Sequence, residues 1–190
     1  MWRFPIHVLR TFAAVLFALV QMSCSGSTVG PTPRRGGAVI LEESFERDGE
    51  PTLKGWRVGN PKLATLVRQP APGGGSWSLR LVADWAPTTG YITMPILGIR
   101  DGDVVRLSAY VRAVNSEGGG LIGLSVGPSG GLLGNRVKRA YTTSTSWALL
   151  TVQDTISLAH GDTVWVSLSS FHTEVVPREG HFDLVTLIRL

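Results

Sequence analysis

Residues 103–113 read DVVRLSAYVRA, and this stretch decides the fold class. Its side chains alternate with a period of two: Val105, Leu107, Ala109 and Val111 fall on one side, and Arg106, Ser108, Tyr110 and Arg112 on the other. Since successive side chains of a strand point to opposite faces, the pattern predicts a strand with one buried and one mixed face. Residues 163–171 read TVWVSLSSF and predict the same arrangement, with Trp165, Ser167, Ser169 and Phe171 on the mixed face.

Similar segments recur from Ala38 onward, separated by Gly, Pro, Asn and Asp at roughly regular spacing. Their composition of Val, Leu, Ile, Thr and Trp favours strands over helices. We expect strands near 38–46, 63–68, 77–84, 90–97, 103–113, 120–127, 136–142, 147–156 and 163–171, with a last strand at 181–189. Short strands joined by tight turns are typical of an all-β sandwich of two antiparallel sheets.

The composition fits one folded domain and argues against a nucleic-acid partner. With 190 residues, 43% hydrophobic and 17% charged, the chain has enough apolar material for a single core. The formal net charge of +4 includes Arg3 and Arg10, which lie in the leader. The other basic residues are scattered singly through the expected strands and turns, where Arg136, Lys138 and Arg139 form the only tight group. No stripe of cations that would follow a phosphate backbone is visible.

The N-terminus has the features of an export signal. Arg3 and Arg10 flank a basic region, residues 11–20 read TFAAVLFALV, and the sequence QMSC follows at residues 21–24. This apolar run is only about half the length needed to cross a bilayer. We therefore expect residues 1–23 to be a signal peptide of the lipoprotein type.

Cys24 is the only cysteine, and it resembles the lipid-modified cysteine of a lipobox, with Ser23 before it and Ser25 after it. Ordinary signal cleavage nearby is the alternative. A thioether to lipid would remove a lone thiol from an oxidising compartment. Residues 24–37 are rich in Gly, Pro, Ser and Thr and are expected to tether residues 38–190. We expect an exported cell-envelope protein anchored through lipid to a membrane, at the outer membrane or cell surface.

Several short motifs occur in an order that matches a known family. They are ESFE at 43–46, GW at 55–56, GSWSLRL at 75–81, DGD at 101–103, LSAYV at 107–111, TSW at 145–147 and FDLV at 182–185. In these motifs residues 41–190 resemble carbohydrate-binding modules of the cenC type, within the galactose-binding-like β-sandwich group. The resemblance implies a jelly-roll β-sandwich.

The same resemblance implies one structural calcium ion. Carried over to this sequence, its side-chain ligands are Glu46 and Asp183, with Glu43 as a less certain third. Calcium takes six to eight oxygen ligands, so two carboxylates completed by loop carbonyls would join the first strand to the last. The alternative is that these residues are ordinary surface acids.

A sugar-binding surface requires aromatic rings beside hydrogen-bonding groups, because a ring face packs against the apolar face of a pyranose. If the mixed faces of 103–113 and 163–171 line one concave sheet, Tyr110, Arg112, Trp165 and Phe171 would form such a groove. Trp85, in a Pro- and Gly-rich turn, would lie at its rim. The alternative is that a loop or partner covers this face and makes it a second small core.

The sequence contains no nucleophile elbow of the G-x-S-x-G type and no H-E-x-x-H zinc motif. We therefore expect a non-catalytic protein that binds a glycan at the envelope. A structural or protein-interaction lipoprotein of the same fold is the main alternative, and a small hydrolase comes third.

Overall fold

The computed structural model describes residues 37–83, 90–115, 118–129, 136–172 and 178–190. The first strands are short: β1 (Ala38–Glu43), β2 (Glu46–Arg47), β3 (Glu50–Pro51), β4 (Arg57–Val58) and β5 (Ala64–Val67). Then follow β6 (Ser78–Ala83), β7 (Tyr91–Ile96), β8 (Val104–Ala113), β9 (Gly118–Gly127), β10 (Arg136–Thr142), β11 (Ala148–Thr155), β12 (Thr163–His172) and β13 (Arg178–Arg189). The helical structure in the described residues is one 3₁₀ turn, η1 (Pro61–Leu63), and no helix there is long and apolar enough to cross a membrane.

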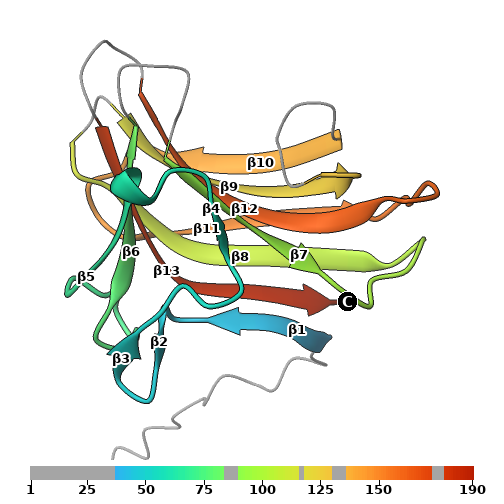
Figure 1. Cartoon of the computed structure of the whole chain (residues 1–190), viewed down its shortest axis with the longest axis horizontal. Coiled ribbons are helices and arrows are strands. Elements are labelled where there is room, and N and C mark those ends of the chain that lie inside the picture. The colour runs from blue at the N-terminus through green and yellow to red at the C-terminus, as the bar shows by residue number, and fades with distance from the viewer. Residues whose placement is uncertain (1–36, 84–89, 116–117, 130–135, 173–177) are drawn as a thin grey trace, which may run out of the picture. The chain divides into compact units, whose positions relative to one another are not determined.

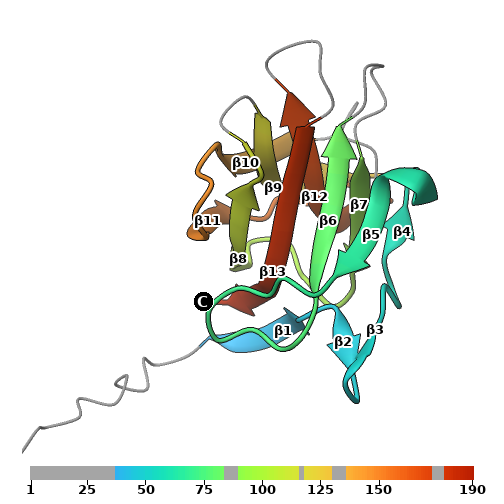
Figure 2. The ribbon, with the colours of Figure 1, turned by 90° about the vertical axis from the view of Figure 1, so that its left-hand side faces the viewer.

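The strands form two antiparallel sheets that pack face to face. The six-stranded sheet has the order β11-β8-β13-β6-β5, with β1 pairing on β13 as well, and Figure 2 shows these strands side by side. The five-stranded sheet has the order β10-β9-β12-β7-β4 (Figure 1). A separate hairpin pairs β2 with β3. The predicted all-β sandwich is confirmed.

The core lies between the two sheets, where the apolar faces of their strands meet. On β8 the residues Val105, Leu107, Ala109 and Val111 are fully buried, as their alternation predicts. Across the core lie the inward residues of the five-stranded sheet: Ile92, Ile122, Leu124, Val126, Val164, Val166 and Leu168. Because the apolar faces point inward, the mixed faces of the two sheets point outward on opposite sides of the sandwich.

The predicted strand at 38–46 is interrupted, and the structure shows why. Phe45 has a left-handed φ of 60°, which ends the pairing of β1 with β13 and turns the chain into the β2-β3 hairpin. The two-residue β4 was not predicted, because so short a strand has no period to detect.

Strand β13 changes neighbour halfway along its length. Residues 178–182 pair with β6, and residues 185–189 pair with β1, while β8 runs along the other side of both halves. The register shifts between Asp183 and Thr186, where Leu184 has a left-handed φ of 49°. This bulge places Asp183 at the junction of the first and last strands.

Candidate functional site

The outward side of the five-stranded sheet is the strongest candidate site. We call it the hydroxyl face and define it by the outward residues of its strands: Arg57, Tyr91, Thr93, Pro95, Leu121, Gly123, Ser125, Gly127, Val137, Arg139, Tyr141, Trp165, Ser167, Ser169 and Phe171. Each of these residues alternates with a neighbour that faces the core. The face thus combines hydroxyl groups, aromatic rings and two guanidinium groups.

One row of this face crosses all five strands in register. Arg57 pairs with Thr93, Thr93 with Ser167, Ser167 with Gly123, and Gly123 with Arg139. An arginine therefore stands at each end of the row, on β4 and on β10, and the three positions between them carry small side chains. Four strand spacings of about 4.8 Å separate the two arginine backbones by about 19 Å.

The centre of the hydroxyl face holds closely packed hydroxyl groups. The side chains of Thr93, Ser125, Ser167 and Ser169 are all buried among their neighbours. Ser167 Oγ donates to the carbonyl of Gly123 at 3.3 Å, and a Cβ on Gly123 would lie only 2.4 Å from that Oγ. Ser125 Oγ has no hydrogen-bond partner among the described residues, although buried hydroxyls are usually paired. These hydroxyls expose almost no surface, so they support the exposed residues of the face rather than meet a ligand directly.

Aromatic side chains flank these hydroxyls. Trp165 is only 3% exposed: its Nε1 donates to the carbonyl of Gly127 at 3.2 Å, and the guanidinium of Arg57 lies 4.7 Å from its ring centroid. Tyr141, on β10, is 65% exposed and meets Phe171 edge to face, with ring centroids 5.6 Å apart. Tyr141 is therefore the ring of this face that is most open to a ligand, whereas Trp165 positions Arg57.

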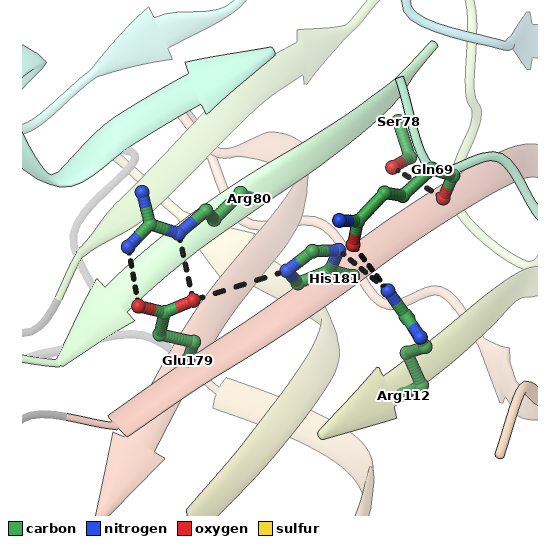
Figure 3. A network of polar contacts seen from close by, with 6 residues as sticks. All are labelled: Gln69, Ser78, Arg80, Arg112, Glu179 and His181. Atoms are coloured by element: carbon green, nitrogen blue, oxygen red, sulfur yellow. Dashed lines mark hydrogen bonds and ion pairs between the residues drawn. The ribbon is translucent and has the colours of Figure 1, made fainter. Parts of the chain in front are cut away.

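The outward side of the six-stranded sheet carries a network of charged residues, shown in Figure 3. Arg80 forms a two-point ion pair with Glu179, with Nε donating to Oε2 at 2.7 Å. Arg112 donates to Gln69 and lies 5.2 Å from the ring centroid of Trp147. The ion pair compensates Arg80 and Glu179, whereas Arg112 has no acidic partner among the described residues and its Nε has no hydrogen-bond partner there.

His181 lies at the centre of this network and is 3% exposed. Its Nδ1 is 3.5 Å from Arg112 Nη2, which can only donate, so the ring proton sits on Nε2, 4.0 Å from Glu179 Oε2. Burial, reinforced by the positive charge of Arg112, lowers the pKa of His181 from 6.5 to about 4. The histidine is therefore neutral in the folded protein at pH 7.

The predicted groove of Tyr110, Arg112, Trp165 and Phe171 is wrong as a grouping. The first two residues lie on β8 of the six-stranded sheet, and the other two lie on β12 of the five-stranded sheet. The two mixed faces point away from each other, because each sheet turns its apolar face to the shared core. Trp165 and Phe171 instead contribute to the hydroxyl face, and Arg112 belongs to the His181 network.

Two of the three predicted calcium ligands reach the same loop, at residues 71–76. Asp183 is fully buried, and its Oδ2 accepts from Ala71 N at 2.8 Å. Glu46 Oε2 accepts from Ser76 N at 2.7 Å. Burial raises the pKa of Asp183, and the negative charge of Glu46 raises it further. Both carboxylates therefore gather at one end of the sandwich without an ion-pair partner among the described residues.

Glu43 is engaged elsewhere. Its Oε1 accepts from Phe45 N at 2.8 Å, and its Oε2 accepts from Trp56 Nε1 at 3.4 Å. In the described part of the chain, no three acidic, histidine or cysteine side chains are clustered as metal ligands. The structure thus brings Glu46 and Asp183 to one loop, whereas Glu43 hydrogen-bonds to Phe45 and Trp56. Cys24 and Trp85 lie outside the described residues.

Sequence reasoning missed Arg57, Thr93, Ser125, Arg139 and Tyr141. Their signal was present as polar or aromatic residues at every second position of each strand. The pattern of a single strand does not reveal which other strand lies beside it, so the row across the sheet emerges only from the pairing.

Comparison with known proteins supports the fold. No family model matches the chain, and no curated protein matches its sequence. Among solved structures, the CBM22-1 xylan-binding domain of Paenibacillus barcinonensis Xyn10C matches with a TM-score of 0.56 at 18% identity, covering 81% of this chain and 96% of that domain. TmCBM61 in complex with β-1,4-galactotriose matches with a TM-score of 0.51 at 18% identity, covering 78% of this chain and 99% of that one.

A third match is a Family 16 Carbohydrate Binding Module-2, with a TM-score of 0.55 at 14% identity, covering 72% of this chain and 92% of that one. At these identities the likeness shows the fold alone. The cenC type in particular remains a prediction. The chain has the jelly-roll β-sandwich fold of carbohydrate-binding modules, as the resemblance in its sequence implied.

Proposed function

We propose that this protein is a non-catalytic glycan-binding module and that the hydroxyl face is its binding surface. The observation that carries the proposal is the open ring of Tyr141, 65% exposed beside Phe171, on the same face as the exposed guanidinium groups of Arg57 and Arg139. An open ring packs against the apolar face of a pyranose, and guanidinium groups donate hydrogen bonds to sugar hydroxyls. Two structural neighbours, a xylan-binding domain and a module in complex with galactotriose, support the same class of ligand.

Replacing Tyr141 by alanine is expected to weaken glycan binding about tenfold, because it removes the most exposed ring of the hydroxyl face. Leu149→Ala is the matched control: Leu149 is 56% exposed, but it lies on the outward side of the six-stranded sheet. The measurement is affinity electrophoresis of the full-length chain in detergent against xylan, β-1,4-galactan and polygalacturonate.

Loss of binding in Leu149→Ala with no change in Tyr141→Ala would move the site to the opposite sheet. If the folded protein retains none of these glycans, glycan binding is refuted, and the structural or protein-interaction role becomes the better assignment.

We also propose that calcium binds between Glu46 and Asp183. Two glycines of the neighbouring loop leave room for these carboxylates: a Cβ on Gly74 would lie 2.3 Å from Asp183 Oδ2, and one on Gly75 would lie 1.8 Å from Glu46 Oε1. The remaining ligands of a calcium ion would be loop carbonyls and water. When bound, the ion would neutralise two nearby carboxylates and join β13 to the turn that follows β1.

Calcium is expected to raise the melting temperature by roughly 5 to 10 °C when it is about a hundredfold above its Kd. Asp183→Asn and Glu46→Gln should each remove most of this calcium-dependent rise in melting temperature. Each variant is compared with itself, with and without calcium, so a change in its own stability does not affect the result. Glu42→Gln, an exposed acid on β1, should keep it. The measurement is thermal unfolding in calcium and in EGTA, and an unchanged melting temperature in the wild-type protein would exclude the site.

The lipid anchor at Cys24 is part of the same proposal. It is supported by the apolar leader ahead of Cys24 and by the tether-like composition of residues 25–37. Such an anchor would hold the module at a membrane of the cell envelope, where it would bind a neighbouring polysaccharide.

A further inference from the structure

The hydroxyl face carries positive charge that no described acidic residue on it neutralises. Arg57 and Arg139 are both exposed, and neither has an acidic partner among the described residues. The other described residues of this face include no aspartate and no glutamate. A ligand on this surface therefore meets two guanidinium groups and no carboxylate.

The neighbouring cations of β10 are already compensated, which sets Arg139 apart. Lys138 Nζ lies 2.8 Å from Asp154 Oδ1, and Arg136 Nη2 lies 3.5 Å from Asp154 Oδ2. Both point to the side of β10 opposite Arg139, because residues 136 and 138 alternate with residue 139 along the strand. Of these three cations on β10, Arg139 alone lies on the hydroxyl face.

The two arginines are placed to act on one ligand. They end the same row of paired residues, and only Thr93, Ser167 and Gly123 lie between them. Thr93 and Ser167 are 3% and 1% exposed, so a ligand along the row would contact mainly the exposed arginines at its two ends. At one end of the row, the guanidinium of Arg57 lies 4.7 Å from the ring centroid of Trp165, so it is partly ordered before a ligand binds.

We propose that the ligand is an acidic polysaccharide that lies along this row, with its carboxylate or sulfate groups bound by Arg57 and Arg139. The proposal rests on the proposed glycan-binding function and names its substrate class. Guanidinium groups bind carboxylates and sulfates through paired, charge-assisted hydrogen bonds.

The test compares glycans that differ only in charge. Full-length protein in detergent is titrated with polygalacturonate and with its fully methyl-esterified form, and with dextran sulfate and dextran. We expect binding to an acidic member and at least tenfold weaker binding to its neutral counterpart, with affinity falling as sodium chloride increases. The two pairs distinguish carboxylate from sulfate recognition.

Variants locate the effect on the row. Arg139→Gln and Arg57→Gln should each weaken binding of the acidic glycan about fivefold to tenfold and reduce its dependence on salt. Arg106→Gln is the matched control, because Arg106 lies on the outward side of the other sheet and its guanidinium hydrogen-bonds to Gln153.

Equal binding of charged and neutral forms, or equal loss in Arg106→Gln, would overturn the acidic-ligand proposal and leave glycan binding intact. Binding of neither form of any glycan, including xylan and galactan, would instead refute the proposed function itself.

Discussion

Replacing Phe182 by alanine is expected to lower the free energy of unfolding by about 3 to 5 kcal/mol. Phe182 is fully buried on β13, between Val111 of β8 and Leu79 of β6 in the same sheet. Its ring also reaches the opposite sheet, since a Cβ on Gly120 of β9 would lie 2.8 Å from Phe182 Cζ. The substitution would leave a cavity between the two sheets. Urea unfolding at neutral pH measures the effect.

A second substitution tests whether that close approach is the cause. Gly120→Ala alone should cost about 1 to 3 kcal/mol, because its methyl group would overlap Phe182 and Val111 Cγ1. In the Phe182→Ala background the cost should be smaller, since the truncated ring leaves room for the methyl group. Additive effects of the two substitutions would show that the glycine is not required by the ring. Leu149→Ala, at an exposed site, should change stability by less than about 0.5 kcal/mol.

Most of the fold could be predicted from alternation alone. The predicted strands at 103–113, 136–142 and 163–171 differ from β8, β10 and β12 by at most a residue at each end. Their period of two is a local property, and burial of one face enforces it. The break after Glu43 was not predictable in the same way, because Phe45 adopts a left-handed conformation that its residue type disfavours.

The candidate site was predicted less well, because it depends on which strands are neighbours. The sequence correctly indicated that Tyr110 and Trp165 lie on mixed strand faces, but it could not assign β8 and β12 to different sheets. Glu46 and Asp183 were paired through a family resemblance, and the structure places both at the loop of residues 71–76. The arginine row was missed, since its members are far apart in sequence and adjacent only through four strand pairings.

Acidification from pH 7 to pH 4 is expected to remove up to about 3 kcal/mol of stability through His181 alone. Burial beside Arg112 lowers the pKa of His181 to about 4 in the folded state, whereas the unfolded chain titrates near 6.5. Between these values the unfolded state binds the additional proton, so stability falls as the pH decreases through this window. Below about pH 4 both states are protonated, and this residue causes no further loss.

The comparison that isolates this effect is wild-type protein against His181→Asn, in urea at several pH values with EDTA present. Asparagine keeps an acceptor for Arg112 but cannot gain a proton, so the variant should lose less stability between pH 6.5 and pH 4. EDTA is needed because Asp183, two residues along β13, is a proposed calcium ligand whose own titration would add to the slope. Equal pH dependence of the unfolding free energy in the two proteins would contradict this prediction. It would mean that the surroundings of His181, including Arg112 and Glu179, do not disfavour its protonated form in the folded state.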